Sequence, residues 1–96
     1  MKVLAIIDVA PGAQTETVRS RLADEIKGSW ALFASGALRE AYATAAPTRV
    51  VFVLEADDLA HAGEQLRKLP LIAAGLLRFE LTELRPFVNW ATLFAG

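Results

Sequence analysis

The stretch RVVFVLE, residues 49–55, decides the fold because it is the clearest β-strand in the chain. Its side chains are apolar on both faces, which is typical of a strand in a sheet that is covered on both sides. The segment KVLAIIDV, residues 2–9, has the same character, with apolar positions 3, 5, 7 and 9 on one face and 4 and 6 on the other. These two strands therefore predict a sheet with a buried centre.

Outward from this pair, the spacing of apolar residues predicts two helices. The first spans about residues 14–35 and ends before Gly36, the residue type that commonly follows a helix. Its predicted buried stripe consists of Val18, Leu22, Ile26, Trp30 and Phe33. Gly28 interrupts this helix at a cost of about 1 kcal/mol relative to alanine, which predicts a close approach of another backbone or a ligand. The second helix begins with Asp57 as its N-cap and ends at Pro70.

Two further strands complete the pattern, at residues 37–44 and 76–84. Strict alternation in the first of them places Leu38, Glu40 and Tyr42 on one face, and Arg39 and Ala41 on the other. The element order β-α-β-β-α-β is that of the ferredoxin-like fold, an α+β domain with a four-stranded antiparallel sheet and both helices on one face. We assign residues 1–86 to this domain.

The sheet face opposite the helices is also apolar, and a bare apolar face of this size is rare on a monomer. We therefore expect two sheets to pack face to face as a dimeric α+β barrel. Composition agrees, because 54% of the 96 residues are hydrophobic and the mean hydropathy is +0.36. The apolar runs are nevertheless shorter than the roughly 18 residues that a membrane-spanning helix needs.

Charge and residue counts narrow the function. Net charge is −1 without a basic cluster, which disfavours a nucleic-acid surface. The chain has no cysteine and one histidine, His61, so we expect no metal site. In the absence of any targeting signal we expect a cytoplasmic protein with a small-molecule substrate.

Glu25 is the first candidate for chemistry. At about 100° per residue it lies beside the apolar stripe of the first helix, where it could face a cleft between helix and sheet. Desolvation there would raise the pKa of its carboxyl group. Polar residues within the strands, among them Asp8, Arg39 and Tyr42, are further candidates, although cross-strand ion pairing would also account for the charged ones.

Several short motifs together resemble the muconolactone Δ-isomerase family. They are Ile7-Asp8-Val9 before a proline-containing loop, ADEIK at 23–27, Gly36 followed by Leu38-Arg39, Leu69-Pro70-Leu71, and FELTEL at 79–84. Their order and spacing cover residues 1–86. Within the family the chain is similar to a branch that carries LREAY at 38–42 and a Pro-Phe…Trp…Leu-Phe tail at 86–94.

The resemblance implies a dimeric ferredoxin-like barrel, able to assemble into rings, that moves a proton within an unsaturated lactone without metal or organic cofactor. On the matching positions, Glu25 would be the carboxylate and Arg39 the electrophilic donor, with Asp8 at the strand end. On chemical grounds we add Tyr42 as a proton donor.

Two other functions stay open. A cofactor-free monooxygenase acting on a polycyclic phenol would need an aromatic-lined pocket, which Trp30, Phe33, Phe52 and Phe79 could supply. A non-catalytic oligomeric ligand-binding protein would use its charged residues as structural pairs.

Residues 87–96 form an apolar tail whose large side chains are Phe87, Trp90, Leu93 and Phe94. Such a terminus is disordered unless it is tied down, and full burial would contribute about 1.5–3 kcal/mol for each of these side chains. We expect the tail to pack on a neighbouring subunit, with a lid over its own helix–sheet cleft as the alternative.

Overall fold

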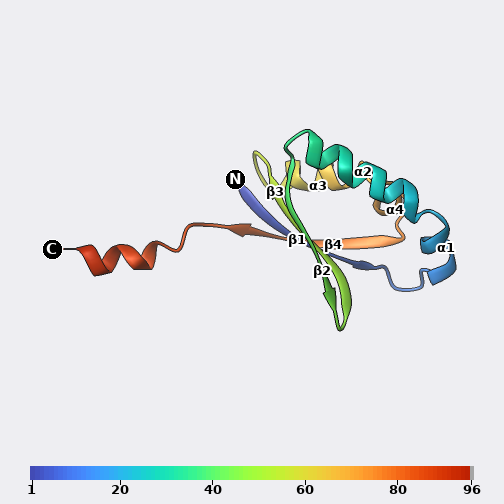
Figure 1. The fold of residues 1–96 in the computed structure, drawn as a ribbon, viewed down its shortest axis with the longest axis horizontal. Coiled ribbons are helices and arrows are strands. Elements are labelled where there is room, and N and C mark those ends of the chain that lie inside the picture. The colour runs from blue at the N-terminus through green and yellow to red at the C-terminus, as the bar shows by residue number, and fades with distance from the viewer. Residues whose placement is uncertain (96) are drawn as a thin grey trace.

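The computed structural model describes residues 1–95, which form a four-stranded antiparallel sheet with all α-helices on one face (Figure 1). In chain order the elements are β1 (Lys2–Val9), α1 (Thr15–Ser20), α2 (Leu22–Ala34), β2 (Leu38–Ala45), β3 (Thr48–Glu55), α3 (Leu59–Leu66), α4 (Pro70–Ala73), β4 (Leu77–Leu84) and the 3₁₀ helix η1 (Val88–Phe94). In the strand order β2-β3-β1-β4, the two strands that are apolar on both faces, β3 and β1, lie at the centre of the sheet. The predicted ferredoxin-like α+β fold is confirmed. No helix in the described part of the chain is long and apolar enough to cross a membrane.

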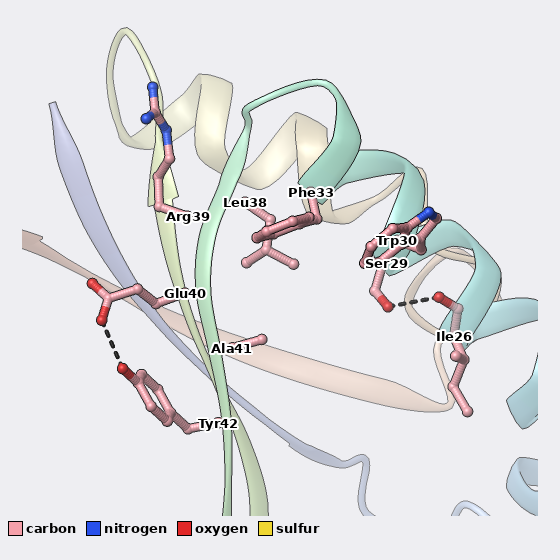
Figure 2. Close-up of a pocket in the computed structure, with 9 residues that line it drawn as sticks. All are labelled: Ile26, Ser29, Trp30, Phe33, Leu38, Arg39, Glu40, Ala41 and Tyr42. Carbon is pink, nitrogen blue, oxygen red and sulfur yellow. Dashed lines mark hydrogen bonds between the residues drawn. The ribbon is translucent and has the colours of Figure 1, made fainter.

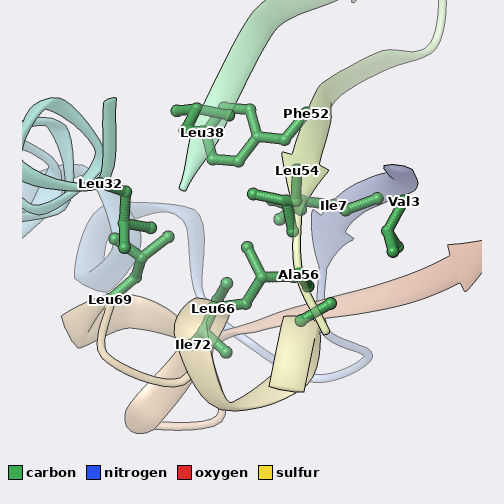
Figure 3. Close-up of a cluster of buried hydrophobic side chains, with 12 residues drawn as sticks. Val3, Ile7, Leu32, Leu38, Phe52, Leu54, Ala56, Leu66, Leu69 and Ile72 are labelled. Atoms are coloured by element: carbon green, nitrogen blue, oxygen red, sulfur yellow. The ribbon is translucent and has the colours of Figure 1, made fainter. Parts of the chain in front are cut away.

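The core lies between the sheet and the helices (Figure 3). Val3 and Leu54 from the two central strands are fully buried, as is Leu66 from α3. Leu69 and Ile72, on either side of the start of α4, close the same cluster. This packing fixes the floor of the cleft described below.

The first helix differs from its predicted form in two ways. It is broken at Arg21 into α1 and α2. The stripe predicted to be buried is largely exposed: Leu22 44%, Ile26 59%, Trp30 67% and Phe33 47%. That prediction is wrong because another side of α2 faces the core.

The buried side of α2 carries Glu25, Gly28 and Leu32 at helical spacing. A Cβ atom on Gly28 would lie 3.0 Å from Cδ2 of Leu69 and 3.6 Å from Cδ of Pro70. Because glycine lets Leu69 and Pro70 pack this closely without displacement, α2 turns its glycine side toward α4 and its apolar stripe outward. The close approach expected at Gly28 is present, but the neighbouring atoms belong to the side chains of Leu69 and Pro70 and not to a backbone or a ligand.

Strand β2 contains a bulge that changes its faces. Leu38 pairs with Leu54 and Glu40 pairs with Val53, so Arg39 is an extra residue without a partner. After the bulge, Ala41 lies on the helix side of the sheet together with Leu38, whereas Glu40, Tyr42 and Thr44 lie on the opposite side. The strict alternation predicted for this strand is therefore wrong.

The second helix also begins and ends differently. Asp58, not Asp57, is the N-cap, and its Oδ1 accepts the backbone N–H of His61 at 2.7 Å. Pro70 ends no helix but occupies the first turn of α4, where the missing N–H of proline is harmless.

The sheet face away from the helices, which we call the open face, has an apolar centre. Strand register brings together Leu4 and Ile6 of β1 with Val51 and Val53 of β3 on this side. Charged residues border this centre at one end, where Asp8 lies between the strands that carry Arg49 and Arg78.

The tail runs away from the domain and contacts none of the cleft (Figure 1). Phe87, Trp90 and Phe94 are 60%, 67% and 84% exposed. In this single chain the tail therefore does not act as a lid over its own cleft.

Candidate functional site

Two adjacent cavities follow α2 where it crosses the sheet. The inner cavity, about 210 Å³, lies between α2, β1, β3 and the loop before α4. The outer cavity, about 430 Å³, lies between the end of α2 and β2. Ile26 and Ser29 line both, so the two form one continuous cleft.

The lining of the inner cavity is apolar except for two side chains, Glu25 and Ser29. The other lining residues are Ile7, Leu22, Ile26, Val50, Phe52, Leu69 and Leu77. A carboxyl group in such surroundings loses hydration that only specific hydrogen bonds can replace.

Glu25 is 8% exposed, and its Oε1 accepts the backbone N–H of Leu71 at 2.8 Å. Burial raises the pKa of the Glu25 carboxyl, an effect that the Leu71 N–H and the positive charge of Arg21 only partly oppose. Among residues 1–95, no side chain or backbone group hydrogen-bonds the second oxygen, Oε2. The group is thus an anchored carboxyl with one free oxygen and a raised proton affinity.

The outer cavity is an aromatic shelf (Figure 2). The rings of Trp30 and Phe33 stack with centroids 5.3 Å apart and planes at 25°. Leu38 and Ala41 lie on the β2 side below Phe33, whereas Arg39 extends away from the shelf. The bulge explains this orientation of Arg39.

Tyr42 lies on the other side of β2 from the shelf. Its hydroxyl donates a hydrogen bond of 2.7 Å to Oε1 of Glu40 (Figure 2). This bond and the negative charge of Glu40 raise the pKa of Tyr42 above its usual value of 10.0. The phenol is therefore firmly protonated at neutral pH.

The structure does not bring the three expected catalytic residues together. Glu25 lines the inner cavity, while Arg39 and Tyr42 border the outer one with exposed side chains that point away from its aromatic rings. Convergence of Glu25 and Arg39 was expected because their elements are consecutive. The bulge directs Arg39 outward instead.

The residues expected to bind ligand lie in different parts of the molecule. Phe52 lines the inner cavity, and Trp30 with Phe33 lines the outer one. Asp8 lies on the open face, where its Oδ2 is 3.4 Å from Nε of Arg49. Phe79 lines neither cavity. The guanidinium carbon of Arg67 lies over its ring, 5.4 Å from the ring centroid.

Sequence reasoning did not single out seven residues that line the inner cavity. They are Ile7, Leu22, Ile26, Ser29, Val50, Leu69 and Leu77. Gly28 carried the available signal, since a glycine that admits Leu69 beside α2 also brings this leucine to the cavity wall.

No protein-family model and no curated protein matches the chain. A solved structure does match: the 5-chloro-2-hydroxyhydroquinone dehydrochlorinase from Burkholderia phenoliruptrix AC1100, in complex with 2,5-dihydroxybenzoquinone. The TM-score is 0.68 at 16% sequence identity, and the match covers 88% of this chain and 94% of the other. At this identity the likeness shows the fold alone, the ferredoxin-like α+β arrangement described above.

Proposed function

We propose that this protein is a cofactor-independent, muconolactone isomerase-like enzyme that moves a proton on a small aromatic-derived ring compound bound in the inner cavity. One observation carries the proposal: Glu25 is a buried carboxyl with a raised pKa and a free oxygen in an apolar cavity. Raised proton affinity makes the carboxylate a stronger base near neutral pH.

The size of the inner cavity favours a substrate with one ring. An engineered apolar cavity of about 150 Å³ binds benzene, so about 210 Å³ accommodates a ring with small substituents. The bound 2,5-dihydroxybenzoquinone of the structural neighbour is likewise a single ring. A substrate held within the inner cavity alone is therefore an unsaturated lactone or an aromatic-derived acid, whereas a polycyclic phenol, the substrate that the monooxygenase alternative requires, would also extend over the aromatic shelf of the outer cavity.

The chemistry follows from the two oxygens of Glu25. Oε1 is held by the Leu71 N–H, which fixes the plane of the carboxylate. Oε2 removes a proton from a carbon next to the substrate carbonyl, and the C–H electron pair moves into a dienolate. The same carboxyl then returns the proton to the far carbon of the conjugated system. The double bond has moved, and the substrate has gained and lost no atoms. The Ser29 hydroxyl, the other polar group of the cavity, donates to the Ile26 carbonyl at 2.8 Å (Figure 2), and rotation away from that acceptor would let it donate to the dienolate oxygen.

A ligand-binding protein without catalysis is the second candidate. The Glu25–Leu71 hydrogen bond favours it, because that bond already gives the buried carboxylate a structural purpose. In this case the cavity would hold a ring compound without exchanging its protons.

Proton exchange separates the two functions. We expect the protein to accelerate exchange of the carbon-bound protons of muconolactone with D₂O, observed by proton NMR. Glu25→Gln should reduce the rate on the order of 10²–10⁴-fold while ring binding persists, because general-base catalysis contributes that much. Glu64→Gln, which changes an exposed glutamate on α3, is the matched control. Binding without exchange would favour the second candidate, and absence of both would contradict the inner cavity as a ligand site.

We further propose that the open face is the interface of a homodimer. Its apolar centre, formed by Leu4, Ile6, Val51 and Val53, is flanked by charged residues. An apolar centre with a polar rim is typical of a stable protein interface. Two open faces packed together would complete a barrel and leave both clefts on the outside.

A further inference from the structure

The groove beside β2 is left uncovered by the rest of the chain. All residues of β2 after Leu38 are exposed, including Ala41 and Ala43 on the helix side. The other wall of the groove is the outward side of α2, which exposes Ile26, Trp30 and Phe33. Monomeric proteins rarely leave a continuous apolar groove of this kind open to water.

The tail has the complementary character. In a 3₁₀ helix, residues three apart lie on the same side. Trp90 and Leu93 therefore form one apolar stripe on η1, which Phe87 at the N-cap continues, and Val88 begins a second stripe that ends at Phe94. Asn89 and Thr92 occupy the remaining side, where the Thr92 hydroxyl donates to the Asn89 carbonyl at 2.7 Å.

Such a segment is not stable alone. Runs of 3₁₀ helix beyond three or four residues are uncommon, and η1 has seven residues, none of them buried. Trp90 packs edge-on against Phe87, the residue just before η1, with ring centroids 5.4 Å apart. Residues 86–95 carry no charge. An uncharged segment with two apolar stripes out of three is suited to an apolar groove.

Strand register places the tail and the groove at the same end of the sheet. The last residue of β4, Leu84, pairs with Lys2, which in turn pairs with Glu55. Leu38, at the start of the groove, pairs with Leu54 in the next row. The tail and the groove lie on opposite edges of the sheet, however, because β4 and β2 are separated by three strand spacings, or about 14 Å. The tail also leads away from the groove of its own chain (Figure 1).

A two-fold axis parallel to the strands removes this separation. Rotation about such an axis keeps each row at its level and brings β4 of one copy over β2 of the other. We propose that η1 of one copy wraps around the β2 edge of a second copy and occupies its α2–β2 groove, so that each cleft is closed by the partner's tail. The aromatic shelf of Trp30 and Phe33 then packs against the stripe centred on the partner's Trp90. This inference concerns what covers the outer cavity and holds whether or not the inner one is catalytic.

Cross-linking tests the proposal, because a chain without cysteine accepts single cysteines as unique labels. One variant carries Ala91→Cys in the tail and another carries Ala41→Cys in the groove. The two are mixed at micromolar concentration and treated with a short flexible bismaleimide. Ala60→Cys, an exposed position on α3, replaces the groove variant as the matched control. All three changes replace alanine with a residue of similar size, so folding is expected to persist.

We expect covalent heterodimers of the tail and groove variants to form on the order of a hundredfold faster than those with the control. A docked pair reacts at a millimolar effective concentration rather than at the micromolar bulk value. Adding Trp90→Ala to the tail variant should abolish most of this advantage. Equal rates for groove and control would overturn the proposal. A chain carrying both cysteines that links only within itself would also overturn it, in favour of a lid formed by its own tail.

Discussion

Glu25→Ala should destabilise the protein because it leaves the Leu71 N–H without a partner. The bond it removes is 2.8 Å long and lies where the carboxyl is only 8% exposed, so water cannot replace it fully. Pro70 has no N–H, and Leu71 therefore provides the first donor of α4. An orphaned buried donor costs about 1–3 kcal/mol, and each kcal/mol lowers the Tm of a domain this size by about 4–8 °C.

Glu25→Gln separates the hydrogen bond from the charge. The amide oxygen still accepts the Leu71 N–H, but no buried negative charge forms. The raised pKa of Glu25 means that the folded chain holds this proton more tightly than the unfolded chain, whose value is near 4.5. The contribution of Glu25 to stability is therefore fully present below pH 4.5 and is lost as pH rises through the folded pKa.

Thermal unfolding at pH 4 and pH 8, followed by circular dichroism, measures both effects. We expect the glutamine variant to equal or exceed the native protein at pH 8 and to lose this advantage at pH 4, with the alanine variant below both at pH 8. Glu64→Gln should leave the pH dependence unchanged. A glutamine variant as unstable as the alanine variant at pH 8 would refute the reasoning, because it would mean that the charge stabilises the fold.

Three other changes have defined outcomes. Gly28→Ala should alter stability by less than about 1 kcal/mol, because the gain in helix propensity offsets the contact with Leu69, yet it should weaken ring binding in calorimetry as Leu69 moves into the inner cavity; unchanged binding would contradict that displacement. Tyr42 is the single tyrosine, so absorbance at 295 nm during alkaline titration should report its pKa alone, with Glu40→Gln shifting the midpoint downward; an unmoved midpoint would show that Glu40 is not the cause. Ile6→Lys places a charge at the centre of the open face and should yield monomers in sedimentation equilibrium, since an unpaired buried charge costs several kcal/mol; a dimer that persists would place the interface elsewhere.

The strands and their order were predictable from sequence because period-two patterns and apolar runs are local signals. The turns around Gly36 and Pro86 bounded them to within one or two residues. The orientation of α2 was not predictable in the same way. Its outward stripe has the spacing of a buried face, and only the tertiary contact between Gly28 and Leu69 reverses it. Apolar periodicity identifies a face that is suited to burial, without showing whether the same chain covers it.

The candidate site shows the same division between local and tertiary signals. Glu25 was predictable because its position at the margin of a stripe depends on helix geometry alone. The expected partnership with Arg39 failed because one extra residue in β2 changes which way every later side chain points. Neither residue type nor spacing in Leu38-Arg39-Glu40 indicates a bulge.

The bulge at Arg39 also has a consequence for colloidal behaviour. Strand β2 is a sheet edge, and an exposed edge offers backbone donors and acceptors to any other strand. Near the bulge, distortion of the ladder and the charges of Arg39 and Glu40 discourage such pairing, but the remaining segment, residues 41–45, is regular and uncharged. Where no partner's tail covers this edge, concentrated or warmed samples should therefore associate first through this half of the strand, and Ala43→Lys should delay the onset of turbidity.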